Sequence, residues 1–112
     1  MSLKKTIETI PQIEVIDGYK ARFVHSETMT MVFWEVESGA SIPIHSHPHE
    51  QLSQITEGEF EMYIVGETLI LKPGSVLIIP PHIEHGGKAL SPCKITDTFN
   101  PVRDDYKALS ES

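Results

Sequence analysis

Short apolar runs separated by turn residues follow one another along the chain, at intervals of about eight to twelve residues. No helical period persists over a useful length. The runs are rich in β-branched and aromatic residues and cover 28–36, 41–47, 51–57, 59–65, 67–71, 75–79 and 93–99. Strands this short gain little singly, and closure into a barrel removes their unpaired edges. The pattern therefore predicts an all-β domain of the sandwich or barrel type.

Alternation within two of these runs assigns their faces, because successive side chains of a strand point to opposite sides. In 59–65, the apolar residues on one side are Phe60, Met62 and Ile64. In 93–99, the polar set Lys94, Thr96 and Thr98 is expected to face solvent. The inward set of that strand then contains an acid: Cys93, Ile95, Asp97 and Phe99. We therefore expect Asp97 to point toward the apolar interior.

The length of 112 residues suits one compact domain and is too short for two. The hydrophobic fraction of 39% and the charged fraction of 22% are typical of a globular protein. No repeat or internal linker is visible, so we expect a single domain over 1–112. Residues 1–9 are expected to form a poorly ordered or strand-exchanged arm. Residues 104–112 are expected to form a short helix or a frayed tail.

Charge and cysteine content exclude several classes of protein. The net charge of −7, with nine scattered Lys and Arg residues, argues against a nucleic-acid partner. No apolar run approaches the roughly 20 residues that span a bilayer, and the N-terminus lacks the features of a signal peptide. Cys93 is the one cysteine, so no intramolecular disulfide can form. We therefore expect a cytoplasmic protein with no membrane partner.

Histidine is the residue type that hints at chemistry, with six copies in the chain. On an extended strand, His45 and His47 project from the same face. Pro48 breaks that strand, and Gln51 can bring a third donor from the neighbouring strand. His85 can supply a fourth from a distant strand. Such donors suit one divalent transition metal (Zn, Ni, Mn, Fe or Co), and four protein ligands leave room for water or substrate.

Two spaced motifs around these donors resemble the paired signatures of the cupin superfamily, G-x5-H-x-H-x3-E-x6-G and G-x5-P-x-G-x2-H-x3-N. The matching residues are Gly39, His45, His47, Gly58, Gly74, Pro80 and His85. Gln51 stands where the pattern has Glu, His82 where it has Gly, and Ala89 where it has Asn. The resemblance implies a jelly-roll β-barrel, a bound metal and, as small cupins commonly pair, a homodimer. An amide at 51 cancels none of the metal's charge, which predicts a stronger Lewis acid than a carboxylate ligand would leave.

A narrower resemblance joins the stretches 45–51, 79–90 and 96–106 to the KdgF-type pectin-degradation cupins, and it extends from about Gly18 to Tyr106. That family opens the ring of 4,5-unsaturated uronates from pectin or alginate to a linear ketone. The resemblance implies that the metal ligands lie beside Asp97, Phe99 and Arg103. The implied partner is a small anionic sugar.

The chemistry of ring opening suggests a role for each of these three residues. The C1 hydroxyl must lose a proton, and negative charge develops on the oxygen at C5, beside the C6 carboxylate. A Lewis-acidic metal would stabilise that charge. Asp97 is the candidate proton shuttle, Arg103 offers a planar fork to the substrate, and Phe99 can stack on the sugar ring. Burial would raise the pKa of Asp97 and the metal would lower it, so its direction stays open.

Simpler roles remain open for the same residues. Asp97 can pair with Arg103 or orient a ligand histidine. Arg103 can belong to the surface of a charged tail, and Phe99 to the core. No role is assigned to the three polar residues near the mouth, His49, Glu50 and His82. Two early residues, Arg22 and Trp34, are expected to be structural.

Two other functions compete with ring opening. One is a cupin dioxygenase acting on a small organic substrate. Gln51 and the resemblance of 96–106 to the uronate-opening family argue against it. The other is a non-catalytic cupin that binds a sugar or a metal. Retained affinity without turnover would support the second of these.

Overall fold

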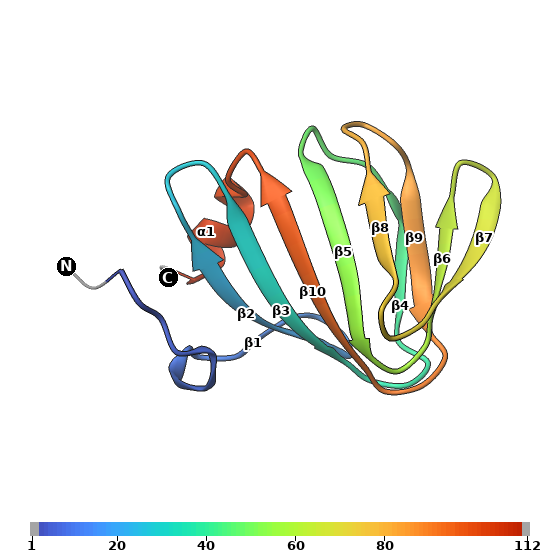
Figure 1. The fold of residues 1–112 in the computed structure, drawn as a ribbon, viewed down its shortest axis with the longest axis horizontal. Helices are drawn as coiled ribbons and strands as arrows, with labels where there is room; N and C mark the ends of the chain where they lie inside the picture. The colour runs from blue at the N-terminus through green and yellow to red at the C-terminus, as the bar shows by residue number, and fades with distance from the viewer. Residues whose placement is uncertain (1–2, 111–112) are drawn as a thin grey trace.

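The computed structural model describes residues 3–110, whose strands form two antiparallel sheets around a shared interior (Figure 1). The larger sheet has the order β1-β2-β3-β10-β5-β8. Its strands are β1 (Ile13–Ile16), β2 (Tyr19–His25), β3 (Thr30–Val36), β10 (Cys93–Asn100), β5 (Glu50–Glu57) and β8 (Val76–Ile79). The smaller sheet has the order β4-β9-β6-β7, formed by β4 (Ser41–His45), β9 (His85–Ala89), β6 (Phe60–Ile64) and β7 (Glu67–Leu71). The prediction of an all-β barrel is confirmed.

Helical structure is confined to the ends of the described chain. A 3-10 turn, η1 (Ile7–Thr9), lies in the exposed N-terminal arm, and α1 (Asp104–Ser110) packs beside β2 (Figure 1). The C-terminal segment is therefore a short helix, one of the two forms expected for it. Residues 1–2 and 111–112, which the predicted arm and tail include, lie outside the described residues. Across residues 3–110, no helix is both long enough and apolar enough to cross a membrane.

The seven predicted runs correspond to β3 to β8 and β10, with bounds that differ by at most two residues. Three strands were not predicted: β1, β2 and β9. In β9, the pair Gly86-Gly87 resembles a turn. Close packing explains why both positions are glycine. A Cβ on Gly86 would lie 2.9 Å from the backbone nitrogen of Ile44, and a Cβ on Gly87 would collide with the carbonyl oxygen of Glu61.

The inner faces of the two sheets form the core, as the alternation indicated. The predicted inward residues of β6 and of β10 are all buried, including Asp97, which is 8% exposed. Asp97 lies opposite Ser53 of β5, and the next inward pair along the same strands is Ile95 with Ile55. One end of this inner wall is therefore polar and the other apolar.

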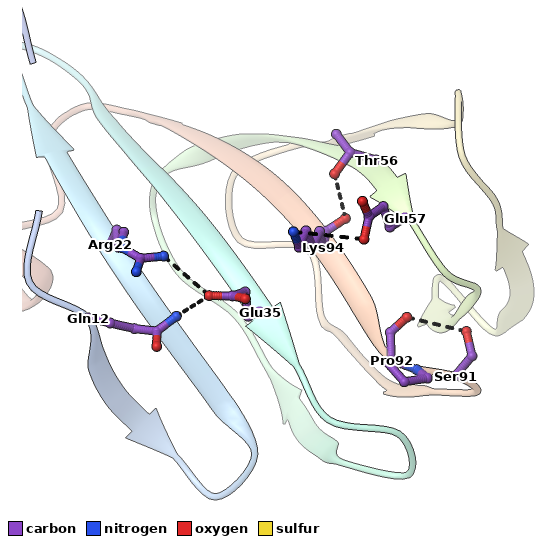
Figure 2. Close-up of polar contacts among 8 residues, drawn as sticks. All are labelled: Gln12, Arg22, Glu35, Thr56, Glu57, Ser91, Pro92 and Lys94. Atoms are coloured by element: carbon purple, nitrogen blue, oxygen red, sulfur yellow. Dashed lines mark hydrogen bonds and ion pairs between the residues drawn. The ribbon is translucent and has the colours of Figure 1, made fainter. Parts of the chain in front are cut away.

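The outer face of the six-stranded sheet carries charged pairs, which Figure 2 shows. Arg22 contacts the carboxylate of Glu35 at 3.2 Å, and the Gln12 amide donates to the same carboxylate. Lys94 lies 3.9 Å from Glu57 on the next pair of strands. Arg22 thus makes surface contacts between strands, away from the interior.

Candidate metal centre

Three histidines converge inside one end of the barrel. His45 ends β4 and lies directly opposite His85, the first residue of β9. Their ring centroids are 4.4 Å apart, and the ring of His47 lies 5.0 Å from that of His85. One ligand atom from each of the three lies within 4.8 Å of the others. These histidines are therefore positioned to hold a metal ion.

The route by which the donors reach this point differs from the prediction in two respects. The strand ends at His45, so His47 lies in the following loop and not on the same strand face. Gln51 lies on β5, which belongs to the six-stranded sheet and does not neighbour β4. It approaches from across the barrel, and its Oε1 lies 3.0 Å from Nε2 of His47. The register that pairs β4 with β9 could not be read from local alternation.

Backbone carbonyl groups set the tautomer of each histidine. Nδ1 of His45 lies 2.9 Å from the carbonyl oxygen of Pro43, and Nδ1 of His85 lies 2.9 Å from that of Ile83. Nδ1 of His47 lies 3.0 Å from the carbonyl oxygen of His49. A carbonyl oxygen only accepts, so Nδ1 carries the hydrogen in all three rings. Each neutral ring is left with a lone pair on Nε2, the usual arrangement of a metal-ligating histidine.

This donor set fits a cation. In the neutral tautomer, the Nε2 lone pair of His47 faces the Oε1 lone pairs of Gln51. Burial, with the nearby charge of Arg103, lowers the pKa of His47 to about 4, and burial also lowers the pKa of His85. At neutral pH a proton therefore does not fill the space between the two acceptors. Imidazole nitrogens with an amide oxygen are donors that suit a divalent transition metal.

A chain of buried hydrogen bonds leads from the metal centre across three strands. Gln51 Nε2 donates to Ser53 Oγ at 3.0 Å, and Ser53 Oγ donates to Asp97 Oδ1. Trp34 Nε1 donates to the other oxygen, Asp97 Oδ2, at 2.9 Å. Burial raises the pKa of Asp97 to about 6, although hydrogen bonds from the side chains of Ser53, Trp34 and Gln51 lower it. Asp97 is thus a buried carboxyl group that titrates near neutral pH.

Two members of this network were not connected with the site from the sequence. Trp34 was expected to be structural, and its indole N–H donates to the carboxylate of Asp97. Ser53 was not considered, although its position two residues after Gln51 places both on the inner face of β5. The spacing of two residues could therefore have identified Ser53 as a neighbour of Gln51 from the sequence. The link from Trp34 to Asp97 spans 63 residues, and no local pattern shows it.

Arg103 is buried in a different set of contacts. Its Nε and Nη2 donate to the two oxygens of Asp105 at 2.9 and 2.7 Å. Its guanidinium carbon lies 3.9 Å from the ring centroid of Tyr106 and 4.7 Å from that of Phe99. Arg103 is therefore buried and is not a surface residue. Its ion-pair partner is Asp105, and not Asp97 as one of the alternatives proposed.

A cavity of about 60 Å³ lies beneath the histidines. Its polar lining residues include His45, Gln51, Ser53, His85 and Asp97, and apolar residues of both sheets line most of the rest. Phe99 lines the cavity and is also fully buried, with its ring edge-on to that of His47. Tyr106, which sequence reasoning left without a role, closes one side from α1.

Two other polar residues near the mouth act through their backbones. The carbonyl oxygen of His49 accepts from His47, as described above, and the backbone N–H of His82 donates to the carbonyl oxygen of His47 at 2.8 Å. His82 has a φ of 65°, in the left-handed region that favours glycine. This conformation explains why the cupin pattern has glycine at that position. Glu50 is exposed at the start of β5.

Comparison with known proteins agrees with this architecture. The family model described as "Cupin domain" matches residues 32–99, more than half of the chain. The chain belongs to the cupin family. Over 99 residues, this cupin is 33% identical to the pectin degradation protein KdgF of Dickeya dadantii (strain 3937), a match that covers 86% of this chain and 90% of that protein.

Solved structures of other cupins are also similar to this chain. KdgF from Halomonas sp. superimposes with a TM-score of 0.84 at 30% identity, covering 88% of this chain and 94% of the other. An RmlC-like cupin from Shewanella frigidimarina NCIMB 400 superimposes with a TM-score of 0.89 at 27% identity, covering 95% and 96%. This cupin is thus similar in sequence and structure to a protein of pectin degradation.

Proposed function

We propose that this cupin opens the ring of 4,5-unsaturated uronate monosaccharides, released from pectin or alginate, to give the linear keto form. The observation that carries the proposal is that three of the four donors, His45, Gln51 and His85, line one cavity together with a buried carboxyl group, Asp97. The similarity to KdgF proteins of Dickeya and Halomonas supports the substrate class.

In this proposal, His45, His47, Gln51 and His85 hold one divalent transition metal. The bound metal would supply a Lewis-acidic positive charge for the oxygen at C5 of the substrate. Because all four donors are neutral, the full charge of the ion remains available to an anionic sugar. This suits a chain whose net charge of −7 would otherwise repel a carboxylate.

Asp97 moves the proton in the proposed reaction. The C1 hydroxyl gives its proton to the carboxylate as the bond between C1 and the ring oxygen breaks. The electrons of that bond remain on the oxygen at C5, as an enolate, and protonation at C4 by the Asp97 carboxylic acid gives the ketone. Burial raises the pKa of Asp97 to about 6 in the protein without a metal, toward the operating pH at which an acid–base group works best.

Arg103 and Phe99 are the proposed substrate-binding residues. Phe99 offers its ring to the cavity between His47 and the guanidinium group of Arg103. Arg103 uses Nε and Nη2 to hold Asp105, and its Nη1 is not part of that pair. We therefore assign to Nη1 the contact with the substrate carboxylate or a hydroxyl group.

The test is to mix the metal-loaded protein with unsaturated monouronate freshly generated by a lyase. We expect the absorbance of the C4=C5 bond to disappear much faster than in the uncatalysed reaction, in a manner that requires both His45 and Asp97. Decay at the uncatalysed rate with Zn, Ni, Mn, Fe and Co each supplied would refute ring opening. Oxygen uptake during turnover would instead support a dioxygenase.

We also propose that the protein is a homodimer. A row of apolar or weakly polar residues crosses the outer face of the six-stranded sheet from β2 to β8: Val24, Met31, Thr98, Leu52 and Ile78. Leu52 and Ile78 are 43% and 63% exposed, on a face that is normally polar when solvent covers it. Light scattering should report a dimer, and Ile78→Glu should convert it to a monomer. A monomeric native protein would contradict this.

A further inference from the structure

The amide of Gln51 has two chemically different ends, and only its oxygen is a metal ligand. An amide can rotate by half a turn with little change in shape, so an additional contact must select the orientation. We propose that Ser53 is a positioning residue that holds the oxygen of the Gln51 amide toward the three histidines. The proposal rests on the metal site proposed above, and it does not depend on the reaction carried out there.

The directions of three hydrogen bonds carry the proposal. The indole N–H of Trp34 can only donate, and it does so to Oδ2 of Asp97. Ser53 has one hydroxyl hydrogen, which it donates to Oδ1 of the same carboxylate. Ser53 therefore has only lone pairs to offer to Gln51. The group that faces Ser53 must be a donor, and the amide NH₂ of Gln51 meets that requirement at 3.0 Å. A hydrogen bond from the same amide also lowers the pKa of Asp97, which agrees with the NH₂ being on this side.

The reversed amide would be unfavourable at its Ser53 end and would block the metal at the other. Its oxygen would face the Ser53 oxygen, whose hydrogen is already used by Asp97. Its NH₂ would donate to Nε2 of His47 and occupy the lone pair that a cation needs. Ser53 is only 3% exposed, and an unmade hydrogen bond is costly in a buried site.

The register of the strands fixes the residues that select the orientation of the Gln51 amide. Ser53 lies two residues after Gln51 on the inner face of β5, and it is directly opposite Asp97 of β10. Asp97 in turn is fixed by Trp34 of β3. The three strands are adjacent in the six-stranded sheet, so the register of the sheet determines which end of the amide faces the metal.

The same hydrogen-bond directions account for Gln at position 51, where the cupin pattern has Glu. A carboxylate at 51 would present an acceptor to Ser53, which has no hydrogen left to donate. It would also place a second negative charge close to Asp97. The Ser53–Asp97 pair therefore selects an amide at position 51.

The first experiment measures metal affinity in Ser53→Ala by competition between the apo protein and a chromophoric chelator, using zinc alone. We expect affinity to fall by roughly 10- to 100-fold, the range for groups that orient a ligand. Thr56→Ala is the matched control, since it removes a hydroxyl from the same strand on the outer face, where it donates to Lys94 (Figure 2). Thr56→Ala should bind zinc like the native protein. Native affinity in Ser53→Ala would refute the proposal.

A double-mutant cycle then tests whether Ser53 acts through Gln51. In a Gln51→Ala background, Ser53→Ala should cause no further loss of zinc affinity. An equal loss in both backgrounds would show that Ser53 acts in another way and would overturn the proposal. The visible absorption of cobalt-loaded protein is the second readout, because Ser53→Ala and Gln51→Ala should give the same altered spectrum while Thr56→Ala keeps the native one.

These measurements separate the inference from the proposed reaction. If the cycle gives the expected result and unsaturated uronate is not consumed, the positioning role of Ser53 stands and ring opening is wrong. If the reaction proceeds and Ser53→Ala binds zinc normally, ring opening stands and the inference is wrong. If the native protein binds no zinc or cobalt, the metal site and the inference both fail.

Discussion

The two sheets of this cupin orient their donors to the metal centre in different ways. On the four-stranded sheet, His45 and His85 each donate Nδ1–H to the carbonyl oxygen of the residue two positions earlier. On the six-stranded sheet, hydrogen bonds join Gln51 to Ser53, Ser53 to Asp97 and Asp97 to Trp34, and these residues come from three strands. The first arrangement is local to the chain and the second depends on sheet register.

This difference indicates where the site is sensitive to substitution. A carbonyl oxygen is present whatever the side chain, so the orientation of the two histidines tolerates change in their neighbours. Gln51 depends on side chains distant in sequence, and each can be removed separately. The network that contacts Gln51 also holds Asp97, so the six-stranded sheet would combine the proposed orientation of Gln51 with the proposed proton transfer.

The largest effect is expected from removing a donor of the four-stranded sheet. His85→Ala should weaken zinc binding by more than the roughly 100-fold that changes in surrounding groups can reach. Chelator competition measures the affinity. His82→Gly is the matched control, because glycine tolerates the φ of 65° at that position and only a ring that holds no metal is lost. Equal affinities for the two variants would show that His85 is not a ligand.

The next largest effect concerns the acid–base group of the six-stranded sheet. Asp97→Asn should lower turnover of unsaturated monouronate by roughly 100- to 10,000-fold at saturating metal, the range for a general acid–base residue. The rate of loss of the C4=C5 absorbance measures this. Asp104→Asn, at the exposed start of α1, should leave the rate unchanged. Native turnover in Asp97→Asn would mean that the carboxylate only orients its neighbours.

The apolar end of the same sheet should affect stability and not the site. Ile55 is 1% exposed and follows Ser53 on the inner face of β5. Ile55→Ala should lower the free energy of unfolding by about 2–5 kcal/mol, the usual cost of such a cavity. Denaturant unfolding measures it, with Ile70→Ala on β7, where the side chain is 46% exposed, as the control of small effect. Ile55 also lines the cavity, but further along β5 than Gln51 and Ser53, so turnover per folded molecule should change little, and a large loss would extend the site into the apolar half.

The smallest effect is expected at the far end of the hydrogen-bond chain. Trp34→Phe removes a hydrogen bond that lowers the pKa of Asp97, so that pKa should rise further. The acid limb of the pH–rate profile should then move to higher pH, and turnover at neutral pH should fall by roughly tenfold, or about 1.4 kcal/mol. Tyr19→Phe also changes the cavity wall, but its hydroxyl bonds the carbonyl of Ala40, so its profile should not move.

Local alternation was enough to predict much of the barrel. The period of two within β6 and β10 identified the inward residues, and it placed the acid Asp97 inside. Glycine and proline marked the ends of seven strands to within two residues. β9 was missed because Gly86-Gly87 has the composition of a turn, while the reason for two glycines is the close approach of neighbouring chains, which only the packed structure shows.

The sequence by itself determined the cupin fold, the inward face of Asp97, and the histidines at 45, 47 and 85 that converge in the barrel. These features depend on residue type and short spacing, which are properties of the chain before it folds. Only the tertiary structure decided that Gln51 reaches the histidines from the opposite sheet, that Arg103 pairs with Asp105, and that Trp34 and Ser53 hold Asp97. Hydrogen-bond partners across strands are set by register and sheet order, and residues 63 positions apart meet only when the barrel closes.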